Sequence, residues 1–222
     1  DETEKIVAHH AVKAITLTGS EAAGSAVSQI ASKYIKKSLL ELGGSNAFIV
    51  LEDADLNLAV ETAVKARMLN SGQSCIAAKR FIIVDTVYDE FVSKFIDKVK
   101  QLKAGDPMLK DTQVGTLARK DLADQLQKQV KDSIEQGAEL LLGGEQNECF
   151  HQPTVLGNVT KDMPAFTEET FGPLAAIIKV KSADEAFEYS ENSIFGFPAN
   201  TNSRSLFLDW VLVYSQKILI KH

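Results

Sequence analysis

The chain has 222 residues, of which 45% are hydrophobic and 24% charged, and its 24 Lys and Arg against 30 Asp and Glu give a net charge of −6. This composition is that of a globular protein, and it excludes a disordered acidic chain, which would hold fewer apolar residues. A pI near 5.3 argues against nucleic acid as a partner, because phosphate binding needs a basic face.

Cysteine usage and the chain start bear on location. Two cysteines, Cys75 and Cys149, are too few for a disulfide framework and favour a reducing compartment. The opening segment DETEKIVAHH lacks the basic start and apolar run of a signal peptide. No apolar stretch reaches the roughly 18 residues of a membrane-spanning helix. We therefore expect a cytoplasmic protein without a membrane partner.

Short apolar runs alternate with amphipathic segments along the chain. We predict strands at residues 12–18, 39–42, 47–51, 79–84, 139–142, 154–159 and 174–180. We predict helices within residues 21–36, 53–69, 86–99, 118–134 and 182–191. Strands that alternate with helices predict an α/β fold with a mostly parallel sheet covered on both faces.

Several residues have the chemistry of helix ends. Asp53 and Asp55 are candidate N-caps of the second predicted helix, and Thr86 of the third, because their side-chain oxygens can accept free amides. Gly137 suits the left-handed position that ends the fourth helix.

Cys75 is the candidate nucleophile. It follows Asn70-Ser71-Gly72-Gln73-Ser74, between a predicted helix and a predicted strand. A glycine-containing turn there can expose the thiol and bring backbone amides close to a ligand. A few per cent of a free thiol is ionised at neutral pH, and the thiolate is a strong nucleophile. The alternative is a small buried hydrophobic residue, which is our interpretation of Cys149.

Glu41 is the candidate general base. It stands between Leu40 and Leu42 in a predicted strand, beside the pair Gly43-Gly44. A carboxylate that is partly desolvated at a strand end is suited to general-base work. Period-two alternation supports a glutamate on the solvent face equally well, so both interpretations stay open.

Two further segments could contact a ligand. Gly19 and Ser20 open a predicted helix whose free amides suit a phosphate, although a packing contact of small residues explains them as well. In the segment EETFGP, Glu169 could accept hydrogen bonds from ribose hydroxyls and Phe171 could pack on a ring, although an acidic turn closed by Gly-Pro is common. The four histidines show no metal-ligand spacing, so we predict no metal site.

The order of these motifs is specific. Thr18-Gly19-Ser20, LELGG at 40–44, Gly72-Gln73-Ser74-Cys75 and EETFGP at 168–173 resemble, across about residues 10–197, the NAD(P)-dependent aldehyde dehydrogenase superfamily. Within it, LELGGSNAFIVLEDADL and AAKRFIIV look most like bacterial succinate-semialdehyde dehydrogenases. The resemblance implies a three-layer α/β/α catalytic domain with a remnant of a Rossmann-like cofactor domain.

The resemblance also implies roles for the candidate residues. Cys75 would attack a small-molecule aldehyde and form a thiohemiacetal, then a thioester once hydride has passed to NAD or NADP. Glu41 would activate the water that releases the carboxylic acid.

The resemblance also implies which residues would contact the cofactor. The resemblance implies that Gly19 and Ser20 lie by its pyrophosphate, that Glu169 binds the nicotinamide ribose and that Phe171 lies beside the ring.

The family's N-terminal half has no counterpart in this sequence. We assign residues 1–44 to the C-terminal remnant of the cofactor domain, 45–197 to the catalytic domain and 198–222 to a divergent tail. Sheet edges left by missing strands predict self-association as a homo-oligomer, and the missing half predicts impaired cofactor binding.

Three functions follow from these expectations. The first is NAD(P)-dependent oxidation of an aldehyde, with succinate semialdehyde as a candidate. The second is a catalytically silent, truncated remnant that folds and self-associates. The third is an acylating dehydrogenase in which coenzyme A takes the thioester, and Glu41 disfavours it because it supplies a base for water.

Overall fold

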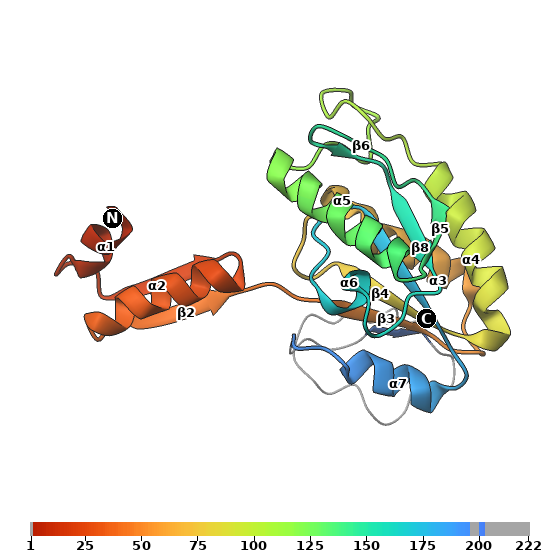
Figure 1. The fold of residues 1–222 in the computed structure, drawn as a ribbon, viewed down its shortest axis with the longest axis horizontal. Coiled ribbons are helices and arrows are strands. Elements are labelled where there is room, and N and C mark those ends of the chain that lie inside the picture. Colours follow the sequence, from red (N-terminus) through yellow and green to blue (C-terminus); the bar gives the residue numbers. More distant parts are fainter. Residues whose placement is uncertain (1, 196–199, 203–222) are drawn as a thin grey trace. The chain divides into compact units, whose positions relative to one another are not determined.

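The computed structural model describes residues 2–195 and 200–202 (Figure 1). The chain divides into two compact units, Asp1–Gly44 and Ser45–His222, which we call unit 1 and unit 2. Of the expected tail at 198–222, only Asn200–Asn202 lies among the described residues, where it forms a strand.

Unit 1 consists of two helices and two strands. Its elements are α1 (Glu2–Ala8), β1 (Ala14–Thr18), α2 (Glu21–Lys33) and β2 (Lys37–Glu41). The strands β1 and β2 pair in parallel, from Ala14 opposite Lys37 to Thr18 opposite Glu41. All of these elements except α1 were predicted from the sequence.

Two residues at the start of α2, Ser20 and Gly24, determine how the helix begins and how closely it packs. Ser20 is the N-cap, and its Oγ accepts a hydrogen bond from the amide of Ala23 at 3.3 Å. A Cβ at Gly24 would lie 2.7 Å from Leu42 Cδ2, so a larger residue there would require this leucine side chain to shift.

Unit 2 holds the larger sheet and most of the helices. Its strands are β3 (Asn46–Val50), β4 (Ala78–Val84), β5 (Glu139–Leu142), β6 (Gln146–Asn147), β7 (Phe150–His151), β8 (Thr154–Gly157), β9 (Leu174–Val180) and β10 (Asn200–Asn202). Its helices are α3 (Leu56–Met68), the 3-10 turn η1 (Leu69–Gly72), α4 (Asp85–Lys100), α5 (Lys120–Glu135), α6 (Pro164–Thr167) and α7 (Ala183–Glu191).

The main sheet of unit 2 has six strands in the order β10-β3-β4-β9-β8-β5. Every neighbouring pair is parallel except β5 and β8, which are antiparallel. The strands β6 and β7 form a separate small hairpin. The prediction of a mostly parallel sheet is therefore confirmed.

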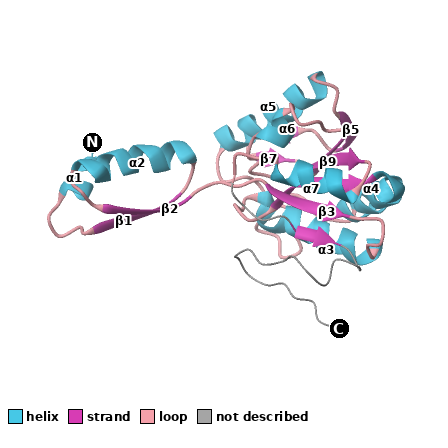
Figure 2. Ribbon diagram, turned by 90° about the horizontal axis from the view of Figure 1, so that it is seen from below, coloured by secondary structure: helices cyan, strands magenta, loops and turns pink. Residues whose placement is uncertain are grey.

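Helices cover both faces of this sheet, as Figure 2 shows. In β3, Ala47 and Ile49 pack in one hydrophobic cluster with α5, α6 and α7, whereas Phe48 and Val50 pack in a second cluster with α3 and α4. Because both faces are buried, the strands are continuous apolar runs. The prediction of a three-layer α/β/α arrangement is confirmed.

Local capping agrees with the sequence at some helix ends. Asp55 caps α3, and its carboxylate accepts from the amides of Asn57 and Leu58. Gly137 follows α5 with a φ of +108°, as expected. The prediction that Thr86 caps α4 is wrong, because this helix begins one residue earlier at Asp85 and no side chain caps its first turn.

Candidate active site

Cys75 lies on a tight turn between η1 and β4. In this turn, residues 74–77, the amide of Ala77 donates to the Ser74 carbonyl at 3.2 Å. We call it the Cys75 turn. Cys75 is half-buried and forms no disulfide. Cys75 is thus partly accessible, as expected, but the expected glycine, Gly72, lies in the preceding 3-10 turn η1 and not in the turn that holds the thiol.

The segment that leads into the turn has an unusual backbone. Asn70, Ser71 and Gly72 have φ values of 54°, 55° and 73° in succession, the left-handed region that side chains disfavour. The side-chain Nδ2 of Asn70 donates to the Gln73 carbonyl at 2.9 Å, and Ser71 Oγ accepts from the backbone amide of Gly115 at 2.9 Å. Such strain persists where surrounding contacts hold it, and it is concentrated at functional sites.

Arg67 joins this segment to the segment that holds Glu169 and Phe171. The side chain projects from α3 and is fully buried. Its Nη2 donates to the carbonyls of Gly72 and Gly172, each at 2.6 Å, and Nη1 donates to that of Ala78 at 3.0 Å. Burial lowers the pKa of Arg67 to about 9, and the charge of Glu169 partly opposes this effect.

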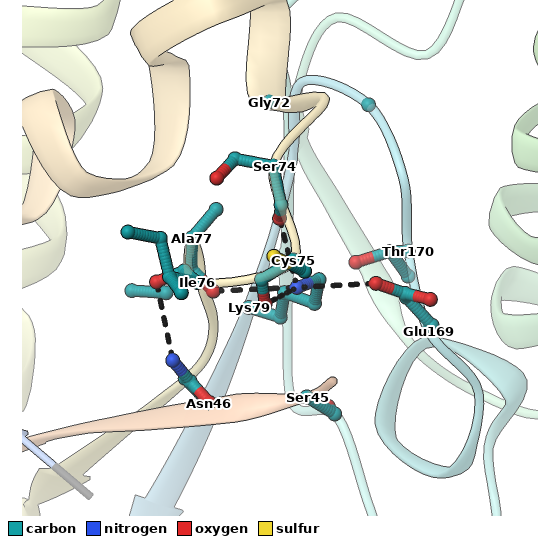
Figure 3. Close-up of polar contacts among 12 residues, drawn as sticks. Ser45, Asn46, Gly72, Ser74, Cys75, Ile76, Ala77, Lys79, Glu169 and Thr170 are labelled. Atoms are coloured by element: carbon teal, nitrogen blue, oxygen red, sulfur yellow. Dashed lines mark hydrogen bonds and ion pairs between the residues drawn. The ribbon is translucent and has the colours of Figure 1, made fainter. Parts of the chain in front are cut away.

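Lys79 is a second buried cation, and it contacts the Cys75 turn itself (Figure 3). Its side chain is 0% exposed, and Nζ donates to the carbonyls of Ser74 and Cys75 at 3.2 and 2.9 Å. Nζ also lies 3.6 Å from Glu169 Oε1. Burial, reinforced by the charge of Arg67, lowers the pKa of Lys79 to about 8, whereas Glu169 raises it.

The strand β3 supplies a further contact. The side-chain amide of Asn46 donates to the Ile76 carbonyl at 3.1 Å. Among the described residues, the buried oxygens Ser45 Oγ, Asn46 Oδ1 and Thr170 Oγ1 have no hydrogen-bond partner. These groups, which Figure 3 shows around the Cys75 turn, leave capacity for a water or a polar ligand atom.

Glu169 and Phe171 lie between α6 and β9. The Glu169 side chain is 22% exposed, and Phe171 is half-buried. The Gln129 side chain of α5 donates to the Glu169 carbonyl at 3.1 Å. A partly exposed carboxylate can accept hydrogen bonds from the hydroxyls of a ribose, and the implied cofactor contact of Glu169 and Phe171 stays a prediction.

The remaining predicted residues lie in unit 1. Glu41 ends β2 and is exposed, so the partial desolvation expected for it is not seen within this unit. Ser20 is exposed at the start of α2, where the first-turn amides have no partner within the helix. This helix start fits an anionic phosphate. Because Glu41 and Cys75 belong to different units, their meeting in one pocket stays a prediction.

Arg67 and Lys79 were not among the predicted site residues. A signal was available, because Lys79 and Arg80 begin a strand, KRFIIV, that is otherwise apolar throughout. A strand buried on both faces has no solvent side, so its charged residues must find internal partners. Arg80 does so as well, through four backbone carbonyls.

The described part of the chain contains neither a metal-binding cluster nor a membrane-spanning helix. No group of three His, Cys, Asp or Glu side chains is placed to hold a metal ion. None of its helices combines the length and the apolar character that crossing a membrane requires.

Comparison with known proteins identifies relatives across nearly the whole chain. The model of the aldehyde dehydrogenase family matches residues 1–206. A succinate-semialdehyde dehydrogenase [NADP(+)] of Mycobacterium avium is 48% identical over 200 residues, 89% of this chain and 42% of the relative. One of Deinococcus radiodurans is 45% identical over 198 residues, 88% of this chain and 42% of the relative.

A solved structure shows the same arrangement. The succinate-semialdehyde dehydrogenase of Burkholderia pseudomallei superposes with a TM-score of 0.88 at 34% identity, covering 92% of this chain and 43% of that one. The chain thus spans about two fifths of the length of these relatives. The extent of the family match, with the agreement in fold, shows that this chain belongs to the aldehyde dehydrogenase family.

Proposed function

We propose that this chain carries the nucleophile-bearing part of an NAD(P)-dependent aldehyde dehydrogenase, with Cys75 as the nucleophile. One observation carries the proposal: the half-buried Cys75 stands on a turn that the buried Lys79 holds near Glu169, while the buried Arg67 holds the residues that flank the turn. A rigid support of this kind is what a reacting sulfur atom needs to meet a carbonyl carbon in one geometry.

The reaction begins when Cys75 Sγ bonds to the aldehyde carbon. The carbonyl oxygen becomes an anion, and the positive charges of Lys79 and Arg67 favour negative charge in this region. Loss of hydride from the same carbon converts the thiohemiacetal into a thioester on Cys75. Water then adds to the thioester, and its breakdown releases the acid and restores the thiol. Glu41 is the residue that we assign to accept the proton of this water.

NAD(P), when bound, supplies the acceptor for the hydride. Gly19 and Ser20 would hold its pyrophosphate, Glu169 its nicotinamide ribose, and Phe171 would lie beside the ring. The names of the relatives favour NADP as the cofactor and succinate semialdehyde as the aldehyde. The homo-oligomer and the cytoplasmic location expected from the sequence remain part of this proposal.

Brief alkylation with iodoacetamide tests the nucleophile. We expect Cys75 to be labelled about tenfold faster than Cys149, measured by peptide mass spectrometry, because a thiol primed for attack reacts faster than an ordinary one. Cys149, also half-buried, is the internal control. Equal or reversed labelling would contradict the assignment of Cys75.

An assay of nicotinamide reduction with succinate semialdehyde separates this function from the silent remnant. Turnover that Cys75→Ala abolishes and Cys149→Ala leaves unchanged supports the enzyme. Selective alkylation of Cys75 without turnover would instead favour the remnant that folds and self-associates.

A further inference from the structure

Lys79 occupies an irregular place in the sheet. Where β3 pairs with β4, Asn46 lies opposite Ala78, but the next residue, Ala47, lies opposite Arg80. Lys79 is therefore the extra residue of a bulge and has no partner on β3. A bulge redirects the side chain of its extra residue, and such irregularities are frequent beside active sites.

The redirected side chain returns to the turn that precedes its own strand. The ammonium donates to the carbonyls of Ser74, Cys75 and Ala77, at 3.2, 2.9 and 3.4 Å. All three carbonyls belong to the Cys75 turn. A point charge with three donors suits several acceptors gathered around one atom, whereas a planar guanidinium does not.

The Lys79 ammonium also contacts the segment between α6 and β9 that holds Glu169. Nζ lies 3.6 Å from Glu169 Oε1, and this ion pair joins two segments that are 90 positions apart in the sequence. The titratable groups that face Lys79 are Arg67 from α3, Glu169 from the segment before β9, and Cys75 from the turn that Lys79 holds. One ammonium thus touches both the backbone of the candidate nucleophile and the carboxylate of the candidate ribose ligand.

We propose that Lys79 is a positioning residue that holds the Cys75 turn and the Glu169 carboxylate at a fixed separation. Through these contacts it sets where the thiol stands relative to the bound cofactor, a role that rests on the proposed function. Its burial has a cost, because a cation withdrawn from water is stabilised only as far as its new partners allow. Lys79 is therefore expected to matter more for local geometry than for overall stability.

Hydrogen exchange of the full chain at pH 7 tests the inference directly. In Lys79→Met, we expect peptides covering residues 69–80 to exchange about tenfold faster, because three carbonyls lose their donor. Peptides of β9 should change by less than about threefold, since the loss is local. Lys179→Met is the matched control: this lysine lies on β9 over the Tyr88 ring, far from the Cys75 turn in sequence. It should leave residues 69–80 unchanged.

A conservative variant tests the geometry of the ammonium, and a pH profile tests its burial. Lys79→Arg keeps the charge but not the point geometry, so its exchange rate should fall between those of the wild type and Lys79→Met. In the wild type, the pKa of Lys79 is about 8 when folded and 10.5 when exposed. The unfolded chain therefore binds more protons between these values, and stability should rise with pH across this range. Lys79→Met, which has no titratable group at this position, should lack that increment.

Two outcomes would overturn the inference. One is an unchanged exchange rate at residues 69–80 in Lys79→Met. The other is a parallel increase in the turn and in β9, which would mean a general loss of stability. If Lys79→Met does not fold, Lys79→Arg decides: wild-type exchange rates at residues 69–80 in that variant would overturn the inference. A failure of the proposed function would look different. In that case, the wild type and Lys79→Met would show the expected exchange rates, but iodoacetamide would label Cys75 of the wild type no faster than Cys149.

Discussion

Gly72 marks the closest approach between the segment that leads to Cys75 and the segment that follows Glu169. Its φ of +73° lies in the left-handed region, and a Cβ there would overlap the carbonyl of Gly172 and lie 2.5 Å from Arg67 Nη2. Two independent reasons, backbone conformation and space, therefore require glycine at this position.

Gly72→Ala should destabilise the chain more than a change of backbone preference alone. We expect a loss of about 3 kcal/mol in the free energy of unfolding, because the methyl group must displace a backbone carbonyl and a buried guanidinium. Gly137→Ala is the control, since Gly137 has a φ of +108° but nothing within 4 Å of the added Cβ. It should cost about 1 kcal/mol. Urea unfolding measures both, and equal losses would contradict the role of the close approach.

The residues of the candidate site differ in how far the sequence predicts them. Cys75 could be singled out because the glycine-containing segment that precedes it is a local pattern. Arg67 and Lys79 were not assigned, because the acceptors that allow their burial come from elsewhere in the chain. The Gly172 carbonyl, for example, lies 105 positions from Arg67. A single sequence shows which residues are charged but not which distant carbonyls they meet.

At the scale of elements, Arg80 connects the central strand β4 to the end of α7. Its guanidinium donates to the carbonyls of Tyr189, Ser190 and Asn192 at 2.9, 3.0 and 3.2 Å, and to that of Ser45 at 2.8 Å. A cation at the C-terminal end of a helix satisfies carbonyls that have no partner within the helix. Burial lowers the pKa of Arg80 to about 10, so it stays charged at neutral pH.

Replacing this cation should release α7 from the sheet. For Arg80→Met we expect a loss of about 3 kcal/mol in the free energy of unfolding, because four carbonyls lose their donor inside the protein. Exchange of amides in α7 should accelerate more than exchange in β9. Arg119→Met, which removes an exposed arginine paired with Asp121, should change neither quantity. If α7 keeps its wild-type exchange in Arg80→Met, the connection is not what holds it.

The elements themselves were predictable to the extent that local pattern determines them. β9 matches its prediction at both ends, because seven residues that are nearly all apolar stand between Gly172-Pro173 and Lys181-Ser182. The four-residue helix α6 was missed because it is too short to show a helical period. A distant contact supports it, since Ser133 Oγ of α5 accepts from the Ala165 amide at 3.0 Å.

For the whole chain, the two units differ in what holds each one together. Among the described residues of unit 1, only two apolar side chains, Val7 and Ala31, are buried. Unit 2 contains two hydrophobic clusters, one on each face of its sheet. Because burial of apolar surface is the main source of folding free energy, unit 1 has much less to stabilise it.

We therefore expect the amides of unit 1 to exchange faster than those of unit 2. In the full chain at neutral pH, we expect amides of β1 and β2 to exchange by local opening, at least about a hundredfold faster than those of β4 and β9 after correction for intrinsic rates. The strand β5 is a useful comparison, since it is a sheet edge like β1 and β2 but belongs to unit 2. If β5 exchanges as fast as β1, edge position explains the rates. If β1 and β4 exchange together, unit 1 shares the stability of unit 2 and its small core does not determine its behaviour.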